Sequence, residues 1–273
     1  MRAARRAWGR LEPVHAMIYF VPEAPERYAA LGLDARAAYF ASRAAAFGRA
    51  SAELVIATFY NFNPDVVRRA IPAAWEKTTP EQVLAARTDA AGAALRRAGI
   101  DRLPDLEEIV ALARRAAEAA GDHAQGRPLY AAHAALAWPD EPILQLWWAQ
   151  TLLREFRGDG HIAVLTAEGV APVEALVLHA ATGSMPKDFL TATRAWPAEQ
   201  WEATAERLRV RGLLDGDALT PEGVAFRQSM EDRTDELALP PYAALGEKDC
   251  DRLAELARPF GKAVMEAGLF TLA

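Results

Sequence analysis

The sequence predicts a mainly α-helical protein made of two related halves, of which the second carries a winged helix with a short β-hairpin wing. Helix start and stop signals recur along most of the 273 residues. Outside one short hairpin, no stretch alternates between apolar and polar residues as a half-buried strand does. A weak internal similarity at a constant spacing indicates that the halves are copies of one unit.

The stretch from residue 196 to 237 contains the winged helix. A helix ends at Gly212, and Asp215-Gly216 forms a tight turn between two apolar pairs. Thr220 then fits the N-cap of the next helix, with Pro221 at its first position. A helix, a very short hairpin and a second helix in this order are typical of a winged helix-turn-helix with a reduced wing.

The other helices follow from caps and breaks. Asp34, Ser51 and Thr79 are typical N-caps. Gly158-Asp159-Gly160 is expected to end one helix and begin another, and Pro259 is expected to kink the last helix. The expected helices cover residues 3–20, 23–31, 35–47, 52–60, 65–70, 80–98, 103–120, 130–138, 141–157, 161–167, 172–181, 186–194, 197–211, 222–239 and 249–267.

Two pairs of similar segments have the same spacing. His15 and His133 each precede an aromatic-Pro-Glu stretch, and 133 − 15 = 118. Glu81 and Glu199 stand in similar helix starts, and 199 − 81 = 118. We therefore expect a duplication, packed as one pseudo-dimeric unit with a ligand cleft between the copies. The expected halves are residues 1–122 and 127–273, joined by the Gly-rich linker at 121–126.

Charge and composition restrict the function classes. The net charge of −6 gives no overall attraction for nucleic acid or for an anionic membrane. The single cysteine, Cys250, excludes an intrachain disulfide and fits a reducing compartment. No apolar run approaches the ~20 residues that span a bilayer. We expect a soluble cytoplasmic protein with no membrane partner, as a monomer or a homodimer.

His15 and His133 are the first candidate ligand-binding residues. Their matching places predict that they face each other across the cleft, as haem or metal ligands or as proton carriers. The alternative is that each is a packed histidine bonded to nearby backbone. Neither stands in a zinc-binding spacing, so no metal site is predicted.

The other candidates are His161, Tyr39, Arg43 and Asn61. His161 follows the expected break at residues 158–160, where a helix N-terminus would favour an anion and lower the pKa of an imidazole. Tyr39 and Arg43 share a helix face at i, i+4, and Asn61 lies among aromatic residues that suit a pocket wall. The alternatives are a surface histidine and a helix end with core aromatics.

Residues from about 160 to 240 resemble the DNA-binding part of the MarR family. The resemblance implies a recognition helix for the major groove and a basic wing for the minor groove. It is carried by Ala205-Glu206-Arg207-Leu208, Arg211-Gly212-Leu213-Leu214 and Leu219-Thr220-Pro221-Glu222-Gly223.

The wing departs from this pattern. Its tip is Asp215-Gly216-Asp217, which is short and acidic and would repel DNA phosphates. Arg207, Arg209 and Arg211 on the expected recognition helix are offset by three glutamates of the same helix, Glu199, Glu202 and Glu206. Nucleic acid is therefore a disfavoured partner.

The whole chain also resembles an actinobacterial family of helical proteins with a C-terminal winged helix, through Arg157-Gly158-Asp159-Gly160-His161 and Phe59-Tyr60-Asn61-Phe62. That resemblance implies a fold and no particular activity. Three functions stay open. The first is binding of a small ligand, haem or another aromatic molecule, on a scaffold with degenerate DNA-binding features. The others are a MarR-like regulator and an enzyme of secondary metabolism with a histidine acid/base.

Overall fold

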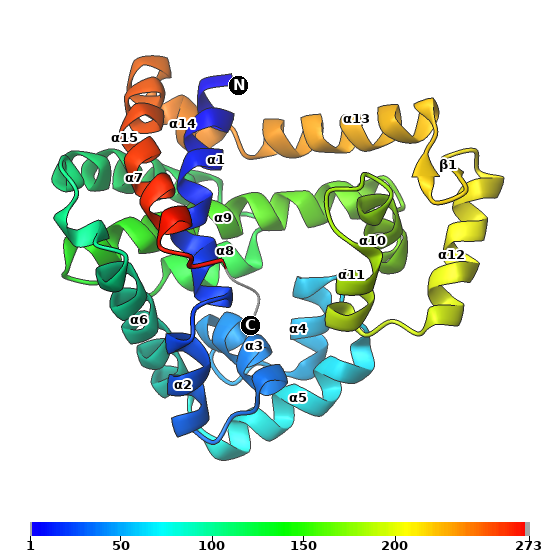
Figure 1. Ribbon diagram of the computed structural model, residues 1–273, viewed down its shortest axis with the longest axis horizontal. Coiled ribbons are helices and arrows are strands. Elements are labelled where there is room, and N and C mark those ends of the chain that lie inside the picture. The colour runs from blue at the N-terminus through cyan, green and yellow to red at the C-terminus, as the bar shows by residue number, and fades with distance from the viewer. Residues whose placement is uncertain (1, 271–273) are drawn as a thin grey trace.

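The computed structural model describes residues 2–270, and its elements are helices apart from one two-stranded hairpin. The predicted fold class, mainly α with a short β wing, is confirmed (Figure 1). The helices are α1 (Arg2–Ala16), α2 (Glu23–Ala30), α3 (Ala35–Ala44), α4 (Ala52–Phe59), α5 (Pro64–Lys77), α6 (Pro80–Arg97), α7 (Leu106–Ala119), α8 (Pro128–Ala134), α9 (Pro142–Ala167), α10 (Pro172–Ala180), α11 (Lys187–Arg194), α12 (Ala198–Val210), α13 (Pro221–Leu237), α14 (Pro240–Leu245) and α15 (Glu247–Glu266). The strands are β1 (Leu214–Asp215) and β2 (Ala218–Leu219), and short 3-10 helices lie at Met17–Tyr19, Ala45–Phe47, Ile100–Arg102 and Ala120–His123.

Helix α9 is the centre of the molecule, with α3–α5 on one side of it and α10–α12 beyond its C-terminal end (Figure 1). Its residues are apolar on most sides because α7, α8 and α13 all pack against it. Among residues 2–270, no single helix has the length and apolar composition needed to cross a bilayer. Helices α9 and α10 meet those criteria only as a pair, across a bend of 105°.

The predicted helix break at Gly158-Asp159-Gly160 is wrong, because α9 continues to Ala167. Gly160 has a packing role instead. A Cβ at Gly160 would lie 2.7 Å from a guanidinium nitrogen of Arg127, so glycine gives this arginine room against α9. Arg127 uses that position to donate hydrogen bonds to the carbonyls of Phe156 and Leu237.

Other helix boundaries also differ from the prediction, with α5 and α8 as examples, and one helix, α14, was not predicted. Helix α5 continues past Ala70 to Lys77 because its second half buries apolar side chains, and the indole of Trp75 donates to the carbonyl of Ala50 (2.9 Å). Helix α8 ends at Ala134, before the expected Trp138. In both places tertiary packing overrides the local signals.

The winged unit, residues 172–237, has the predicted layout. The strands pair antiparallel with Leu214 opposite Leu219. The hydroxyl of Thr220 caps α13 by accepting from the N–H of Gly223. A Cβ at Gly223 would lie 2.1 Å from the carbonyl oxygen of Leu213, so only glycine lets α13 begin this close to the hairpin.

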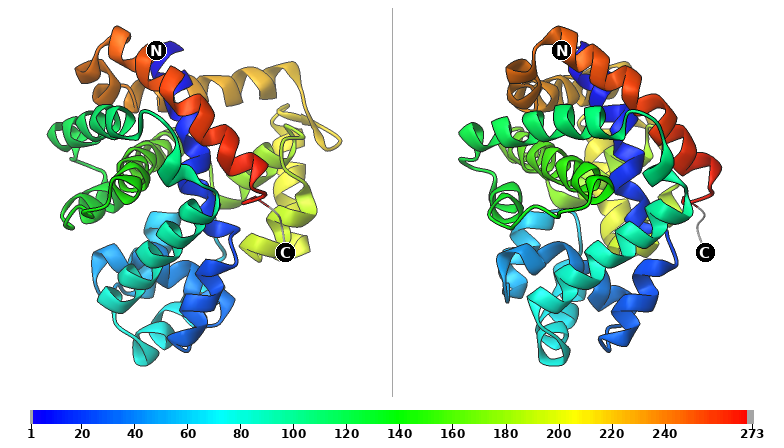
Figure 2. Two further views of the ribbon diagram at one scale, coloured as in Figure 1. Left: turned by 60° about the vertical axis from the view of Figure 1, so that its left-hand side comes forward. Right: turned by 90° about the vertical axis from the view of Figure 1, so that its left-hand side faces the viewer.

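Buried apolar residues within 2–270 form two clusters. The larger runs from α1 to the first part of α9 and includes α14 and α15, which return to pack on α1 and α7 (Figure 2). The smaller belongs to the winged unit and the end of α9. The clusters therefore meet within α9, and not in the segment between residues 122 and 127.

The order of elements supports the expected duplication, which stays a prediction. Helices α4 to α7 follow one another as α10 to α13 do, with a 3-10 turn at Ile100–Arg102 in the place of the hairpin. Helices α6 and α12 begin 198 − 80 = 118 residues apart, and α7 and α13 end 237 − 119 = 118 residues apart. This is the spacing found in the sequence.

Candidate functional site

A central cleft of about 420 Å³ lies between the winged unit and the N-terminal helices. One wall comes from α3 and the end of α4, residues 39–62, and the facing wall from α10 and α11, residues 175–194. The C-terminal part of α9, residues 154–165, and α13, residues 227–231, complete it. The volume falls within the range of small-molecule sites.

The wall formed by α3 and α4 is aromatic. Phe40 on α3 packs with Phe59 at the end of α4 and with Phe62 just beyond it. Tyr39 packs with Phe40 and Phe62, and all these ring-centroid distances are 5.0 to 6.4 Å. Phe40 is fully buried, whereas Tyr39, Phe59 and Phe62 line the cleft. The local sequence Phe59-Tyr60-Asn61-Phe62 thus supplies both a wall and the turn that follows α4.

Tyr60 occupies a strained backbone conformation. Its φ of 51° and ψ of −65°, together with a hydrogen bond from Asn61 N to Phe59 O (2.6 Å), form a classic γ-turn, which is rare. The side chain compensates by reaching the segment just before the winged unit, where its hydroxyl donates to the carbonyl of Val170 (2.5 Å). The strain therefore places Tyr60 across the boundary between the two core clusters.

The same turn makes further contacts with the winged unit. The N–H of Asn63 donates to the carbonyl of Arg194 (3.0 Å), and its amide nitrogen donates to the carbonyl of Ala195 (2.9 Å). The indole of Trp196 donates to the carbonyl of Asn61 (2.9 Å). The turn after α4 is thus a polar latch between the N-terminal helices and α11.

Arg43 and Glu155 form a buried ion pair in the cleft. Their side chains are 15% and 5% exposed, and the closest N–O distance is 3.6 Å. Burial acts to raise the pKa of Glu155, but the charge of Arg43 and of its other neighbours lowers it to about 2. Arg43 also donates from Nη1 to the hydroxyl of Tyr39 (3.1 Å), while its buried Nε has no hydrogen-bond partner among residues 2–270.

Asp159 lies one turn beyond Glu155 and also lines the cleft. Its Oδ2 accepts the backbone N–H of Tyr130 (2.9 Å), so it holds the first turn of α8 against α9. Burial raises its pKa to about 7; the N–H of Tyr130 acts against this shift, and the charge of Glu155 adds to it. Asp159 is therefore a buried acid that titrates near neutral pH.

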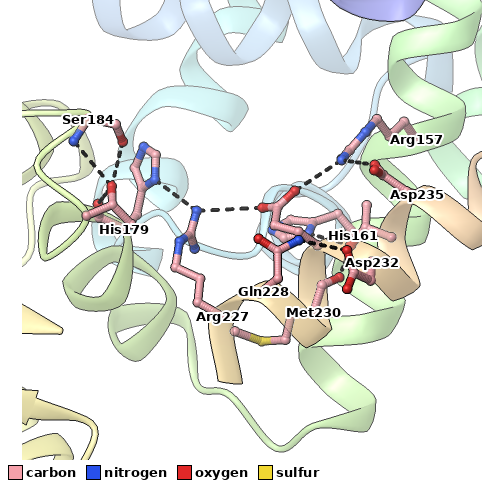
Figure 3. Close-up of polar contacts among 12 residues, drawn as sticks. Arg157, His161, His179, Ser184, Arg227, Gln228, Met230, Asp232 and Asp235 are labelled. Atoms are coloured by element: carbon pink, nitrogen blue, oxygen red, sulfur yellow. Dashed lines mark hydrogen bonds and ion pairs between the residues drawn. The ribbon is translucent and has the colours of Figure 1, made fainter. Parts of the chain in front are cut away.

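The α13 side of the cleft carries a chain of polar contacts (Figure 3). Arg227 lies 3.3 Å from Nδ1 of His179 and 3.6 Å from Glu231. Glu231 in turn accepts from Arg157 (3.1 Å), which also bonds Asp235 (2.8 Å). Each charge at this end of the cleft is thus balanced by a neighbour.

His161 lies within α9 and not at a helix start, so the predicted dipole effect of a helix N-terminus does not apply to it. Its Nδ1 is 3.0 Å from the hydroxyl of Thr234, which itself donates to the carbonyl of Met230. The hydroxyl therefore accepts from Nδ1–H, leaving Nε2 as the acceptor nitrogen. Burial lowers the pKa of His161, which favours the neutral ring.

His15 does not line the cleft. Its ring stacks on Trp147, and its Nδ1 is 2.8 Å from the hydroxyl of Thr151. Because that hydroxyl donates to the carbonyl of Trp147, Nδ1 carries the proton and Nε2 accepts from the hydroxyl of Tyr19 (3.3 Å). Burial holds the pKa of His15 well below its ordinary value, and the charge of Arg87 lowers it further. With both nitrogens engaged, His15 does not fit a haem or metal ligand.

His133 is also buried outside the cleft, with Nδ1 2.9 Å from the carbonyl of Leu129. The structure thus brings Tyr39, Arg43, Asn61 and His161 together as lining residues, and leaves His15 and His133 in the core beneath them. Among residues 2–270, no group of three or more His, Cys, Asp or Glu side chains is arranged to hold a metal ion.

Comparison with known proteins identifies the family. A sequence model that describes a helix-turn-helix family matches residues 4–271 of the chain. The chain belongs to this helix-turn-helix family. No curated protein and no solved structure gives a significant match.

In this helix-turn-helix protein, the helix pair itself is α11 and α12, joined by a turn in which Ala195 has a positive φ of 58°. The arginines of α12 are occupied by contacts inside the winged unit. Arg209 bonds Glu202 (2.8 Å) and Glu206 (3.0 Å), and it also reaches the hairpin. Arg211 pairs with Glu174 (3.3 Å). At Arg209 and Arg211 a phosphate would have to compete with carboxylates already in place, whereas Arg207 donates to the Ala203 carbonyl and the Thr204 hydroxyl of its own helix.

The sequence analysis missed several cleft residues. Glu155 and Asp159 stand four residues apart in a largely apolar helix, a spacing that places both carboxylates on one face, and this signal was available. Arg194 and Arg227 gave no comparable signal, since surface helices commonly carry single arginines. Their place in the cleft depends on how the winged unit packs, which the sequence does not show.

Proposed function

We propose that this helix-turn-helix protein binds a small aromatic molecule in the central cleft, with the winged unit serving as one wall of the site. The observation that carries the proposal is the cleft itself, about 420 Å³ in volume and lined by Tyr39, Phe59 and Phe62 on one side and by the winged unit on the other. Ligand sites commonly combine apolar walls with a few polar groups, here Arg43 and His161.

Native mass spectrometry of the protein as purified tests the proposal without an added ligand. We expect a mass above that of the chain, which is lost on denaturation. A cleft-filling substitution, Ala175→Trp on α10, should abolish the added mass, whereas Ala111→Trp on the exposed face of α7 should keep it. A retained ligand in Ala175→Trp would place binding elsewhere, and a bare chain that takes up no aromatic probe would refute the proposal.

Haem is one form of this ligand, and an absorbance spectrum tests it. His161 and His179 are the histidines that line the cleft, so they are the residues that could hold the iron. We would expect the Soret band to be lost in His161→Ala or His179→Ala and kept in His15→Asn. A colourless protein that does not take up added haem would remove the haem form and leave the proposal of an aromatic ligand standing.

A DNA-binding regulator is the second candidate, favoured by membership of a helix-turn-helix family. The charge of α12 and the wing opposes it. Residues 198–217 contain five acidic and three basic side chains, so 3 − 5 = −2. Because phosphate contacts dominate affinity for DNA, we expect no mobility shift with the DNA upstream of its own gene, even at low salt. A salt-sensitive shift that Arg207→Glu abolishes would instead support the regulator.

A further inference from the structure

Two arginines reach the central cleft from its opposite walls. Arg43 belongs to α3, and Arg194 is the last residue of α11 in the winged unit. The guanidinium carbon of Arg43 lies 4.3 Å from the ring centre of Phe59, and that of Arg194 lies 4.7 Å from the ring centre of Phe62. Both phenylalanine rings pack on Phe40, so the two guanidinium groups lie over one continuous aromatic surface.

Neither guanidinium has its full set of partners. Arg194 donates from Nη1 to the hydroxyl of Thr193 (2.8 Å), and its buried Nε has no partner among residues 2–270. No Asp or Glu within that range is at ion-pair distance from it. Arg43 has a similarly unpaired Nε, and Glu155, at 3.6 Å, is beyond hydrogen-bond length. Buried donors without partners are costly, so each guanidinium retains hydrogen-bonding capacity that its protein neighbours do not use.

The electrostatics of the site agree with this deficit. Burial lowers the pKa of Arg194, the charge of Arg43 lowers it further, and Tyr39 acts in the opposite direction. The two positive charges are thus close enough to repel each other. Of the acids lining the cleft, Glu155 pairs with Arg43, and Glu231 is held by Arg157 and Arg227 on the α13 side. The third, Asp159, accepts the backbone N–H of Tyr130.

A charge count sets the kind of anion. Arg43 and Arg194 contribute two positive charges and Glu155 one negative charge. Arg154 is balanced by Glu12, and Asp159 is neutral below its pKa of about 7, so below that pH 2 − 1 = +1 is left to balance. A monoanion fits this balance, and a planar carboxylate matches the fork of a guanidinium better than a tetrahedral dianion does.

We infer that the cleft binds an aromatic carboxylate, whose carboxylate group bridges Arg43 and Arg194 while its ring lies against the phenylalanine wall. This inference rests on the proposed function and adds the chemistry of the ligand. It has a structural consequence. The bridging carboxylate links α3 to α11, so it fixes the winged unit against the N-terminal helices in addition to the latch at residues 60–63.

Matched acid and amide probes test the inference by calorimetry. We expect 1-naphthoate to bind the wild-type protein at least tenfold more tightly than 1-naphthamide, which has the same ring and no charge. Arg194→Gln should weaken naphthoate binding roughly ten- to hundredfold, the range of charge-assisted hydrogen bonds, and leave naphthamide unchanged. Arg69→Gln, on the exposed face of α5, is the matched control and should bind both probes like wild type.

A second variant and a second readout protect the test from misfolding. Arg194→Lys keeps the charge without the fork and should give an intermediate affinity, and circular dichroism should show an unchanged helix content in each variant. In wild type, naphthoate should slow amide hydrogen exchange in residues 187–194. Equal binding of acid and amide, no effect of Arg194→Gln, or no binding of either probe would overturn the inference. A neutral ligand found by native mass spectrometry would overturn it as well, while leaving the proposed function intact.

Discussion

Asp159→Asn is expected to change the pH dependence of stability more than stability itself. Asp159 is 6% exposed, and its Oδ2 accepts the N–H of Tyr130 at the start of α8. Asparagine has almost the same shape, and its amide oxygen can accept the same hydrogen bond. The substitution therefore removes the ionisation of this side chain and keeps its contact.

The magnitude follows from the shift of the pKa. Burial raises the pKa of Asp159 to about 7 from the value of 3.8 for an exposed aspartate. Between these two pH values the folded protein holds a proton that the unfolded chain has released. The contribution of this carboxyl to the free energy of unfolding is therefore fully present below pH 3.8 and is lost as the pH rises through 7, at roughly 1.4 kcal/mol per pH unit.

Urea denaturation of both proteins at pH 5 and pH 7.5 measures the effect. Relative to wild type, Asp159→Asn should gain about 2 to 3 kcal/mol between the two pH values, because asparagine has no proton to lose. Asp122→Asn, at an exposed position before α8, should differ from wild type in free energy of unfolding by the same amount at both pH values. A constant difference for Asp159→Asn would refute the reasoning, as would a loss of several kcal/mol at both pH values, which would show that the charge is required.

Three other outcomes are expected in equilibrium unfolding. Gly223→Ala should destabilise the protein by about 3 kcal/mol or more, because the new Cβ overlaps the backbone of Leu213. Gly9→Ala, in open space within α1, should stabilise the protein by about 0.5 to 1 kcal/mol. Equal effects of the two substitutions would contradict the packing argument. Tyr60→Phe should cost about 1 kcal/mol by removing the hydrogen bond to Val170 and lower the thermal midpoint, and an unchanged midpoint would show that the latch does not depend on it. In the Asp159→Asn variant, which lacks the opposing effect of that carboxyl, acidification from pH 7 to 5 should lower the urea midpoint, because burial holds the pKa of His15 below that of the unfolded imidazole; a rising midpoint would contradict this.

Local signals predicted most of the secondary structure because they act through short-range hydrogen bonds. The side chains of Asp34, Ser51 and Thr220 each accept backbone N–H groups as N-caps. Thr79 and Gln82 form a complete capping box at the start of α6. In these places a residue and its partners are at most three positions apart, so the sequence contains the whole interaction.

Long-range packing explains what the sequence did not predict. Gly160 resembles a helix break until the position of Arg127 is known, since the arginine directly precedes α8 and bonds a carbonyl of α13. His15 and His133 were expected in the cleft on the basis of matching positions in the chain. Matching positions in the chain do not imply that both side chains reach the cleft. His15 is covered by Trp147 and His133 by Trp148.

Helices α6 and α12 begin 118 residues apart. Their placement argues for function in the central cleft. Helix α6, the counterpart of α12 if the halves are copies, buries Val83, Ala90 and Leu95 completely and packs on α2. Its exposed face carries Glu81, Gln82 and Asp89, and its two last arginines, Arg96 and Arg97, pair with Glu141 and Glu23. Helix α12 is accessible, but its Arg209 is paired with Glu202 and Glu206, and its Arg207 donates to the Ala203 carbonyl and the Thr204 hydroxyl of the same helix. A pseudo-dimer that reads DNA needs two accessible recognition helices. Here both helices expose charges of mixed sign, whereas Arg43 and Arg194, each with a buried Nε that has no partner among residues 2–270, line the cleft.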